Sequence, residues 1–217
     1  MSAATQWWWV RHAPVPEAGG RILGCLDADC DVSDVASFES LAEILPGEAV
    51  WIVSPLRRTQ ATFEAIHAFR PALPEPLIEA ALIEQSFGLW QGQSWAEMQA
   101  SDPERYAAFW QDPTRNAPPE GESFAAQMAR VGAAIARLTG EFAGRVIVAI
   151  AHGGTIRAAV AKALTLSPPQ AMAVVVDNLS VTRLDHLADQ PQPVTGGAWR
   201  VRCVNVPCRW ISDASAC

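Results

Sequence analysis

Short, mainly apolar runs constrain the fold of this chain more than any other feature of its sequence. The clearest is Val146–Ala151, which has no polar residue on either face, and Trp7–Val10 and Val50–Ser54 are similar. A strand without a polar face must be covered on both sides, as in the middle of a parallel sheet. Each run is followed by polar or glycine residues and then by a helical pattern. The sequence therefore predicts an α/β fold, a three-layer α/β/α sandwich with a mostly parallel central sheet.

The remaining elements follow from the same kind of periodicity. Ser123–Phe142 carries apolar residues at every third or fourth position, the spacing of one helix face. Further helices are predicted at Val35–Ile44, Arg58–Phe69, Ser94–Gln111 and Thr155–Leu164, and further strands at Ala173–Val176, Ser180–Asp185 and Trp199–Val204. Trp7, Trp8 and Trp9 fit a strand with alternating burial, and contact of one face with a partner subunit is the alternative.

The length of 217 residues and the hydrophobic content of 50% provide the material for one large core. One domain over residues 1–217 is therefore favoured, with two domains as the alternative. Within it, residues 90–122 combine a helical pattern with a proline-rich loop, and we expect them to form a small helical cap inserted over the sheet. The tryptophans Trp90, Trp95 and Trp110 of this cap segment are expected either to build its own core or to stack against an aromatic substrate.

The net charge limits the classes of partner that the chain can bind, and the cysteines indicate its cellular location. A formal net charge of −7 argues against nucleic acid or an anionic membrane as partner, but a few Arg and His residues can still make one pocket positive. No secretory signal and no apolar run of about 18 residues is visible, so we expect no membrane span. The five cysteines contain no CxxC pair, which favours free thiols over a disulfide framework and predicts a cytoplasmic location.

The polar residues that carry chemistry follow the predicted strands. Arg11 and His12 come after the first strand, Ser54–Thr59 after the second, and His152–Gly154 after the central apolar strand. The carboxyl ends of parallel strands meet at one edge of a sheet, where α/β proteins bind their ligands. Two imidazoles and two guanidiniums gathered there suit a phosphate dianion, because Arg offers a planar fork of donors and His adds a further donor.

Four motifs resemble those of one known family. Val10–Arg11–His12 resembles the RHG signature of the histidine phosphatase (phosphoglycerate mutase-like) superfamily, while Ser54–Thr62 and Ala151–Gly154 resemble its second and third signatures. Glu84–Gly92 is similar to the stretch that carries the proton donor of that family. The resemblance covers most of the chain, from about Trp7 to Leu184, with the motifs in the expected order.

The resemblance implies a role for each of five residues. His12 is the expected nucleophile, and Glu84 is expected to protonate the leaving group and then to activate water. Arg11, Arg58 and His152 are expected to bind the phosphoryl group of the substrate. No cofactor and no metal ion is expected, since Arg and His supply the positive charge. Other acids that compete with Glu84 for the proton-transfer role are Glu79, Glu97 and Glu120.

This sequence also departs from the family pattern. The usual glycine after the nucleophile is Ala13, and the asparagine expected a few residues later is missing, so Arg21 or the backbone of Gly19–Gly20 is the candidate to replace it. The residues after Glu84 lack the Arg–Tyr–Gly pattern that mutases carry, which favours a hydrolase.

The expected function is a phosphomonoesterase that acts on a small phosphorylated metabolite through phosphohistidine, and a homodimer is the assembly that the sequence leaves open. A phosphoglycerate mutase and a non-catalytic protein that binds phospho-ligands are the alternatives. Gly20–Gly24 and Asp27 are also similar to family members labelled α-ribazole phosphatase.

Overall fold

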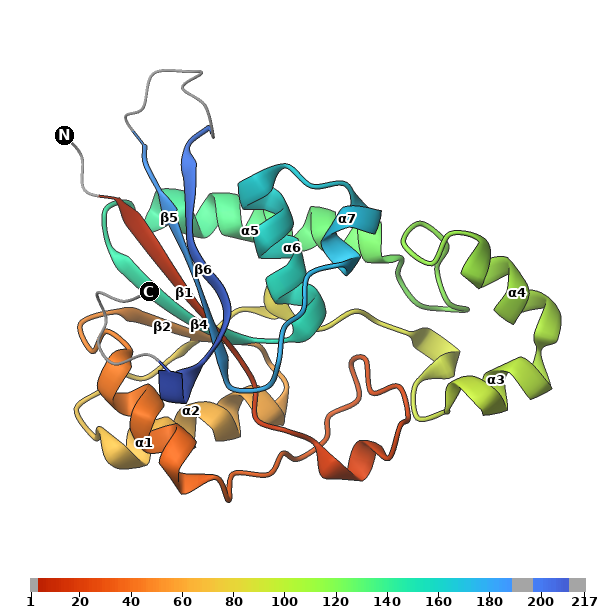
Figure 1. Ribbon diagram of the computed structural model, residues 1–217, viewed down its shortest axis with the longest axis horizontal. Helices are drawn as coiled ribbons and strands as arrows, with labels where there is room; N and C mark the ends of the chain where they lie inside the picture. Colours follow the sequence, from red (N-terminus) through yellow and green to blue (C-terminus); the bar gives the residue numbers. More distant parts are fainter. Residues whose placement is uncertain (1–3, 189–196, 211–217) are drawn as a thin grey trace.

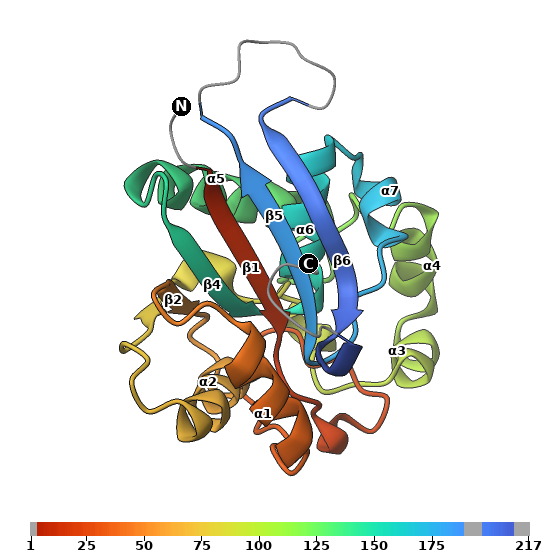
Figure 2. The ribbon, with the colours of Figure 1, turned by 60° about the vertical axis from the view of Figure 1, so that its left-hand side comes forward.

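The central sheet has six strands, and its order places the three predicted functional loops on neighbouring strands. The computed structural model describes residues 4–188 and 197–210, and within them the strand order is β3-β2-β4-β1-β5-β6 (Figures 1 and 2). The strands are β1 (Thr5–Arg11), β2 (Val50–Val53), β3 (Leu77–Ile78), β4 (Val146–Ala151), β5 (Ser180–His186) and β6 (Trp199–Pro207). The four strands from β3 to β1 run parallel to one another, and β5 pairs antiparallel with both of its neighbours, β1 and β6. The predicted mostly parallel α/β sandwich is confirmed.

Helices cover both faces of this sheet. The longer helices are α1 (Val35–Ile44), α2 (Arg57–Phe69), α3 (Trp95–Ser101), α4 (Pro103–Gln111), α5 (Phe124–Glu141), α6 (Gly153–Leu164) and α7 (Pro168–Met172), and short 3₁₀ turns lie at Pro16–Ala18, Ala80–Leu82, Gly88–Trp90 and Cys208–Trp210. Helices α1 and α2 pack on one face, and α5 and α6 pack on the other (Figure 1).

Strand β1 shows why the chain forms two cores. Trp8 and Val10 belong to the core under α1 and α2, whereas Trp7 and Trp9 belong to the core under α5 and α6. Successive side chains of a strand point to opposite faces, so an unbroken apolar run feeds both cores at once. The three tryptophans are at most 1% exposed, and none of them offers a surface to a partner subunit.

The register of the parallel strands aligns the loops that follow them. Arg11 at the end of β1 lies opposite Ala151 at the end of β4, and Val53 at the end of β2 lies opposite Ile150. The residues that directly follow Arg11, Val53 and Ala151 are all polar. The pairing therefore carries His12, Ser54 and His152 to the same edge of the sheet.

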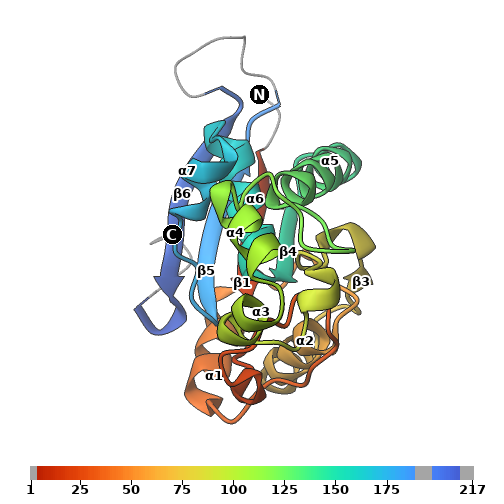
Figure 3. The ribbon, with the colours of Figure 1, turned by 90° about the vertical axis from the view of Figure 1, so that its right-hand side faces the viewer.

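The cap segment, residues 90–122, extends beyond that edge and lies in front of β1 and β5 in Figure 3. The single helix predicted over Ser94–Gln111 is wrong: Pro103 divides it into α3 and α4, because proline disfavours a helical conformation at the preceding residue and lacks an N–H. Asp102 instead caps α4 by accepting a hydrogen bond from the backbone N–H of Arg105. Trp90 packs with Ile22, Met98 and Phe109, and Trp95 packs against this small core.

The strand predicted at Ala173–Val176 is also wrong. This segment is irregular and follows α7, and its carbonyl groups accept hydrogen bonds from two arginine side chains that β1 and α6 present. A four-residue apolar run is too short for its periodicity to distinguish a strand from a covered loop. The short strand β3 and helix α7 were not predicted.

The structure bears on the predictions about the cysteines and about membrane-spanning segments. Cys25, Cys30 and Cys208 are free thiols, as predicted, but Cys203 is disulfide-bonded, which corrects the expectation for that residue. Cysteine pairing depends on which residues the fold brings together, and spacing along the chain does not reveal it. Among the described residues, no helix combines the length and the apolar character needed to cross a bilayer.

The central strand yields a stability prediction. Trp9 is fully buried and stacks on Trp7 with a ring separation of 4.8 Å, whereas Trp210 is 80% exposed. We expect Trp9→Ala to lower the free energy of unfolding by about 3–5 kcal/mol, because it removes contacts and leaves a cavity. The matched change Trp210→Ala should stay within about 0.5 kcal/mol. Urea denaturation followed by circular dichroism measures both, and equal losses would contradict this account of the core.

Candidate active site

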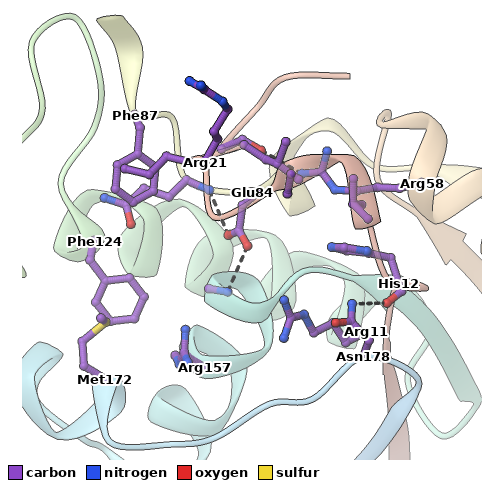
Figure 4. Close-up of a pocket in the computed structure, with 17 residues that line it drawn as sticks. Arg11, His12, Arg21, Arg58, Glu84, Phe87, Phe124, Arg157, Met172 and Asn178 are labelled. Atoms are coloured by element: carbon purple, nitrogen blue, oxygen red, sulfur yellow. Dashed lines mark hydrogen bonds between the residues drawn. The ribbon is translucent and has the colours of Figure 1, made fainter. Parts of the chain in front are cut away.

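A cavity of about 390 Å³ opens at the carboxyl edge of the sheet (Figure 4). Four of the five residues predicted to form the site, Arg11, His12, Arg58 and Glu84, line it. The fifth, His152, is fully buried, and its ring centroid lies 5.2 Å from that of His12. Residues distant in the sequence therefore come together, and they do so where the strand register directs the three loops.

His12 is held as a neutral imidazole. Its Nδ1 lies 2.7 Å from the carbonyl oxygen of Ala13, and since a carbonyl only accepts, Nδ1 is the protonated nitrogen. Burial lowers the pKa of His12 well below 6.5, and the positive potential of His152, Arg58 and Arg11 acts in the same direction. Nε2 therefore carries a free lone pair at neutral pH. The loop itself is fixed by Asn178, whose Nδ2 donates to the His12 carbonyl at 2.7 Å.

His152 has one nitrogen bound and one without a partner. Its Nε2 lies 2.7 Å from the Ser54 hydroxyl, and its buried Nδ1 has no hydrogen-bond partner among the described residues. Burial lowers the pKa of His152 well below 6.5, with Arg58 and Arg11 as further causes. A buried polar atom without a partner is costly, so an unpaired imidazole nitrogen beside His12 indicates a position where a ligand supplies the partner.

The two predicted arginines are fixed by backbone carbonyls rather than by carboxylates. Arg58 is 1% exposed and donates to the carbonyls of Leu26 and Gly24, both at 2.7 Å. Arg11 donates to the carbonyl of Val176 at 2.6 Å. The Nε of each has no partner within the described chain, and burial lowers the pKa of both guanidiniums. Arginine stays protonated in proteins, so these groups contribute positive charge that no neighbouring ion pair neutralises.

Glu84 is the acid that the structure brings into the cavity. Its Oε1 accepts from Nε2 of Gln127 at 2.8 Å. Its Oε2 accepts from the backbone N–H of Gly154 at 3.2 Å (Figure 4). Gly154 lies in the first turn of α6, where unpaired N–H groups and the helix dipole favour an anion. A carboxylate held this way can both give and take a proton beside the phosphate-binding groups.

The competing acids are engaged elsewhere. Glu79 pairs with Arg137 and Glu97 pairs with Arg21 at 2.8 Å, while Glu120 lies in an exposed turn of the cap segment. Glu97 and the carbonyl of Gly92 together bind the guanidinium of Arg21, which therefore links the loop after His12 to the cap segment. Arg21 lines the mouth of the cavity, and Gly19 and Gly20 are not among the residues that line it.

Several lining residues carried no role in the sequence analysis: Phe124, Arg157 and Met172. The sequence around Arg157 gives no signal that distinguishes it from other residues of a helix, and only the packing of α6 against the strand edges turns it into the cavity. Phe124 and Met172 form an apolar wall at the far end from His12 (Figure 4). None of the three cap tryptophans lines this cavity. Trp90 and Trp95 belong to the core of the cap segment, whereas Trp110 is 46% exposed and contacts the rings of Trp95 and Phe109 from outside it.

The site agrees with a known family. The model of the histidine phosphatase superfamily (branch 1) matches residues 7–197. The chain belongs to this superfamily. Its members that resemble this chain include phosphatases, which supports a hydrolase role for it.

Three known proteins are similar to this chain. A bifunctional protein of Mycobacterium tuberculosis is 30% identical over 159 residues, which cover 73% of this chain and 41% of that protein. A metal-independent phosphoserine phosphatase of Arabidopsis thaliana is 31% identical over 155 residues, 69% of this chain and 64% of that protein. The crystal structure of the alpha-ribazole phosphatase from Shigella flexneri has a TM-score of 0.77 at 22% identity, and the match covers 94% of this chain and 97% of that one. The chain thus spans about two fifths of the mycobacterial relative, and the crystal structure shows the shared fold.

The two buried histidines predict how stability depends on pH. Their pKa values in the folded chain lie well below 6.5, so below pH 6.5 the unfolded chain binds more protons than the native one. Their contribution to the free energy of unfolding is thus complete above pH 6.5 and is lost as the pH falls below it. Urea denaturation between about pH 7.5 and pH 5.5 should show this loss, and His12→Asn should flatten it. Identical slopes for the parent and the variant would contradict the burial of a neutral His12.

Proposed function

We propose that this protein is a phosphomonoesterase that hydrolyses a small phosphorylated metabolite through a phosphohistidine at His12. The observation that carries the proposal is the neutral His12, with a free lone pair on Nε2, beside three positively charged or hydrogen-donating groups. Arg11, Arg58 and His152 would bind the three equatorial oxygens and stabilise the charge that spreads over them in the transition state. The cytoplasmic location and a homodimer stay predictions from the sequence.

The reaction proceeds in two displacements. Nε2 of His12 attacks phosphorus while the ester P–O bond breaks, and Glu84 in its protonated form gives a proton to the leaving alkoxide. Water then attacks phosphorus, the P–N bond breaks, and the Glu84 carboxylate takes the proton of that water. Inorganic phosphate leaves, and His12 and Glu84 return to their starting states.

The central test replaces the nucleophile. His12→Ala should lower phosphate release from p-nitrophenyl phosphate by about 10³-fold or more, since the covalent route is lost. A chelator should leave the parent activity unchanged, and rapid quenching with a ³²P-labelled substrate should trap label on His12. Equal turnover by the parent and His12→Ala would refute the proposal. A protein that isomerises 3-phosphoglycerate faster than it hydrolyses esters would be a mutase instead.

Two adjacent glycines provide a matched test of Glu84. A Cβ at Gly154 would lie 2.5 Å from Oε1 of Glu84 and 2.6 Å from Oε1 of Gln127, whereas a Cβ at Gly153 meets nothing closer than 3.7 Å. Gly154→Ala should displace these two flexible side chains and lower kcat for an alkyl phosphate by about 10²-fold, because proton transfer contributes that much. Gly153→Ala should stay within a few-fold of the parent. With both variants folded by circular dichroism, equal activities would remove Glu84 from the mechanism.

A further inference from the structure

Arg157 is a third guanidinium in the cavity, and the proposed hydrolysis leaves it without a task. It lies on α6, one turn after Gly153, and lines the cavity. Its Nε donates to the carbonyl of Val174 at 2.8 Å, which fixes the plane of the group. Within the described chain its two terminal nitrogens have no hydrogen-bond partner and no ion pair. The fork that these nitrogens form is therefore available to a ligand.

Among the described residues Arg157 forms no ion pair, and its charge lies close to that of Arg11. The Nε of Arg11 and a terminal nitrogen of Arg157 lie 3.7 and 3.8 Å from the point that a Gly153 Cβ would occupy. This proximity contributes to the lowered pKa of Arg11, although burial is the larger cause. Arg21, at the mouth of the same cavity, has its counter-ion in Glu97. Two like charges held close together in a partly buried pocket favour a ligand with more negative charge than one phosphate group carries.

The position of Arg157 shows which part of the ligand it meets. In Figure 4, Glu84 and Arg157 lie on opposite sides of the cavity, between the end formed by Arg11 and His12 and the wall formed by Phe124 and Met172. A phosphoryl group bound at His12 directs its ester oxygen toward Glu84. The leaving group then passes between Glu84 and Arg157 toward the apolar wall.

We propose that Arg157 binds a carboxylate on the leaving group, so that the substrate is the phosphate ester of a small hydroxy acid. The inference rests on the proposed phosphatase function and adds the class of substrate. A carboxylate is planar and accepts two parallel hydrogen bonds from one guanidinium fork, which is what the free terminal nitrogens offer. A second phosphate group would call for more than one cationic side chain, as the first phosphoryl site provides with the guanidiniums of Arg11 and Arg58.

The test compares two esters that differ only at the carboxylate. 3-Phosphoglycerate and glycerol 3-phosphate share the phosphate and the carbon chain, and differ by a carboxylate against a hydroxymethyl group. The parent should favour 3-phosphoglycerate in kcat/KM of phosphate release by about 10–100-fold, the range of hydrogen bonds to a charged group. Arg157→Met should bring this ratio close to one, mainly through a higher KM for 3-phosphoglycerate. Arg157→Lys should give an intermediate ratio, because it keeps the charge without the planar fork.

Three results separate the possible outcomes. Arg105, an exposed arginine of α4, provides the matched control, and Arg105→Met should keep the ratio of the parent. A parent ratio near one, or equal losses for both esters in Arg157→Met and Arg157→Lys, would overturn the proposal. Should Arg157→Met not fold, the parent ratio and Arg157→Lys still decide. Hydrolysis of p-nitrophenyl phosphate that depends on His12 tests the phosphatase function by itself, so its failure is distinguishable from failure of the carboxylate subsite.

Discussion

The structure depends on two guanidiniums that are buried without a direct ion pair at the carboxyl edge of the sheet. Arg58 is 1% exposed and Arg11 is partly buried, and burial lowers the pKa of both. Removing charge from water is costly unless a partner compensates it. Backbone carbonyls satisfy part of each guanidinium and leave its charge in place. The protein therefore holds a pocket whose potential is positive inside a chain of net charge −7.

The same potential explains why one carboxylate belongs in this pocket. Glu84 raises the pKa of Arg11 and Arg58 and so offsets part of the cost of burying them. Two donors hold its carboxyl group, the Gly154 N–H and the buried amide of Gln127, whose Oε1 has no partner among the described residues. In the proposed reaction, rotation of this amide by half a turn presents Oε1 as an acceptor when Glu84 carries the proton.

The sequence predicts an element well where a long local pattern specifies it, and poorly where contacts between distant residues decide the structure. The run Val146–Ala151 predicts its strand with the observed bounds, because six residues without a polar face leave few alternatives. The short run Ala173–Val176 misled, because hydrogen bonds from Arg11 and Arg157 hold it as a loop, and those contacts arise only in the folded chain. The strand ends predict which loops meet. The turn of Arg157 into the cavity depends on helix packing that no local pattern records.

The two imidazoles have different roles in the proposed reaction, because each forms a hydrogen bond with a different kind of group. A carbonyl fixes the Nδ1–H form of His12 and leaves Nε2 as the nucleophile of the proposed reaction. The hydroxyl of Ser54 beside His152 can donate or accept a hydrogen bond. Its contact with Nε2 is therefore compatible with either tautomer of His152. A phosphoryl oxygen near Nδ1 of His152 favours the tautomer with the proton on Nδ1, and Ser54 then donates to Nε2. In the proposed complex the fold fixes the tautomer of His12, and substrate binding selects the tautomer of His152 that donates from Nδ1.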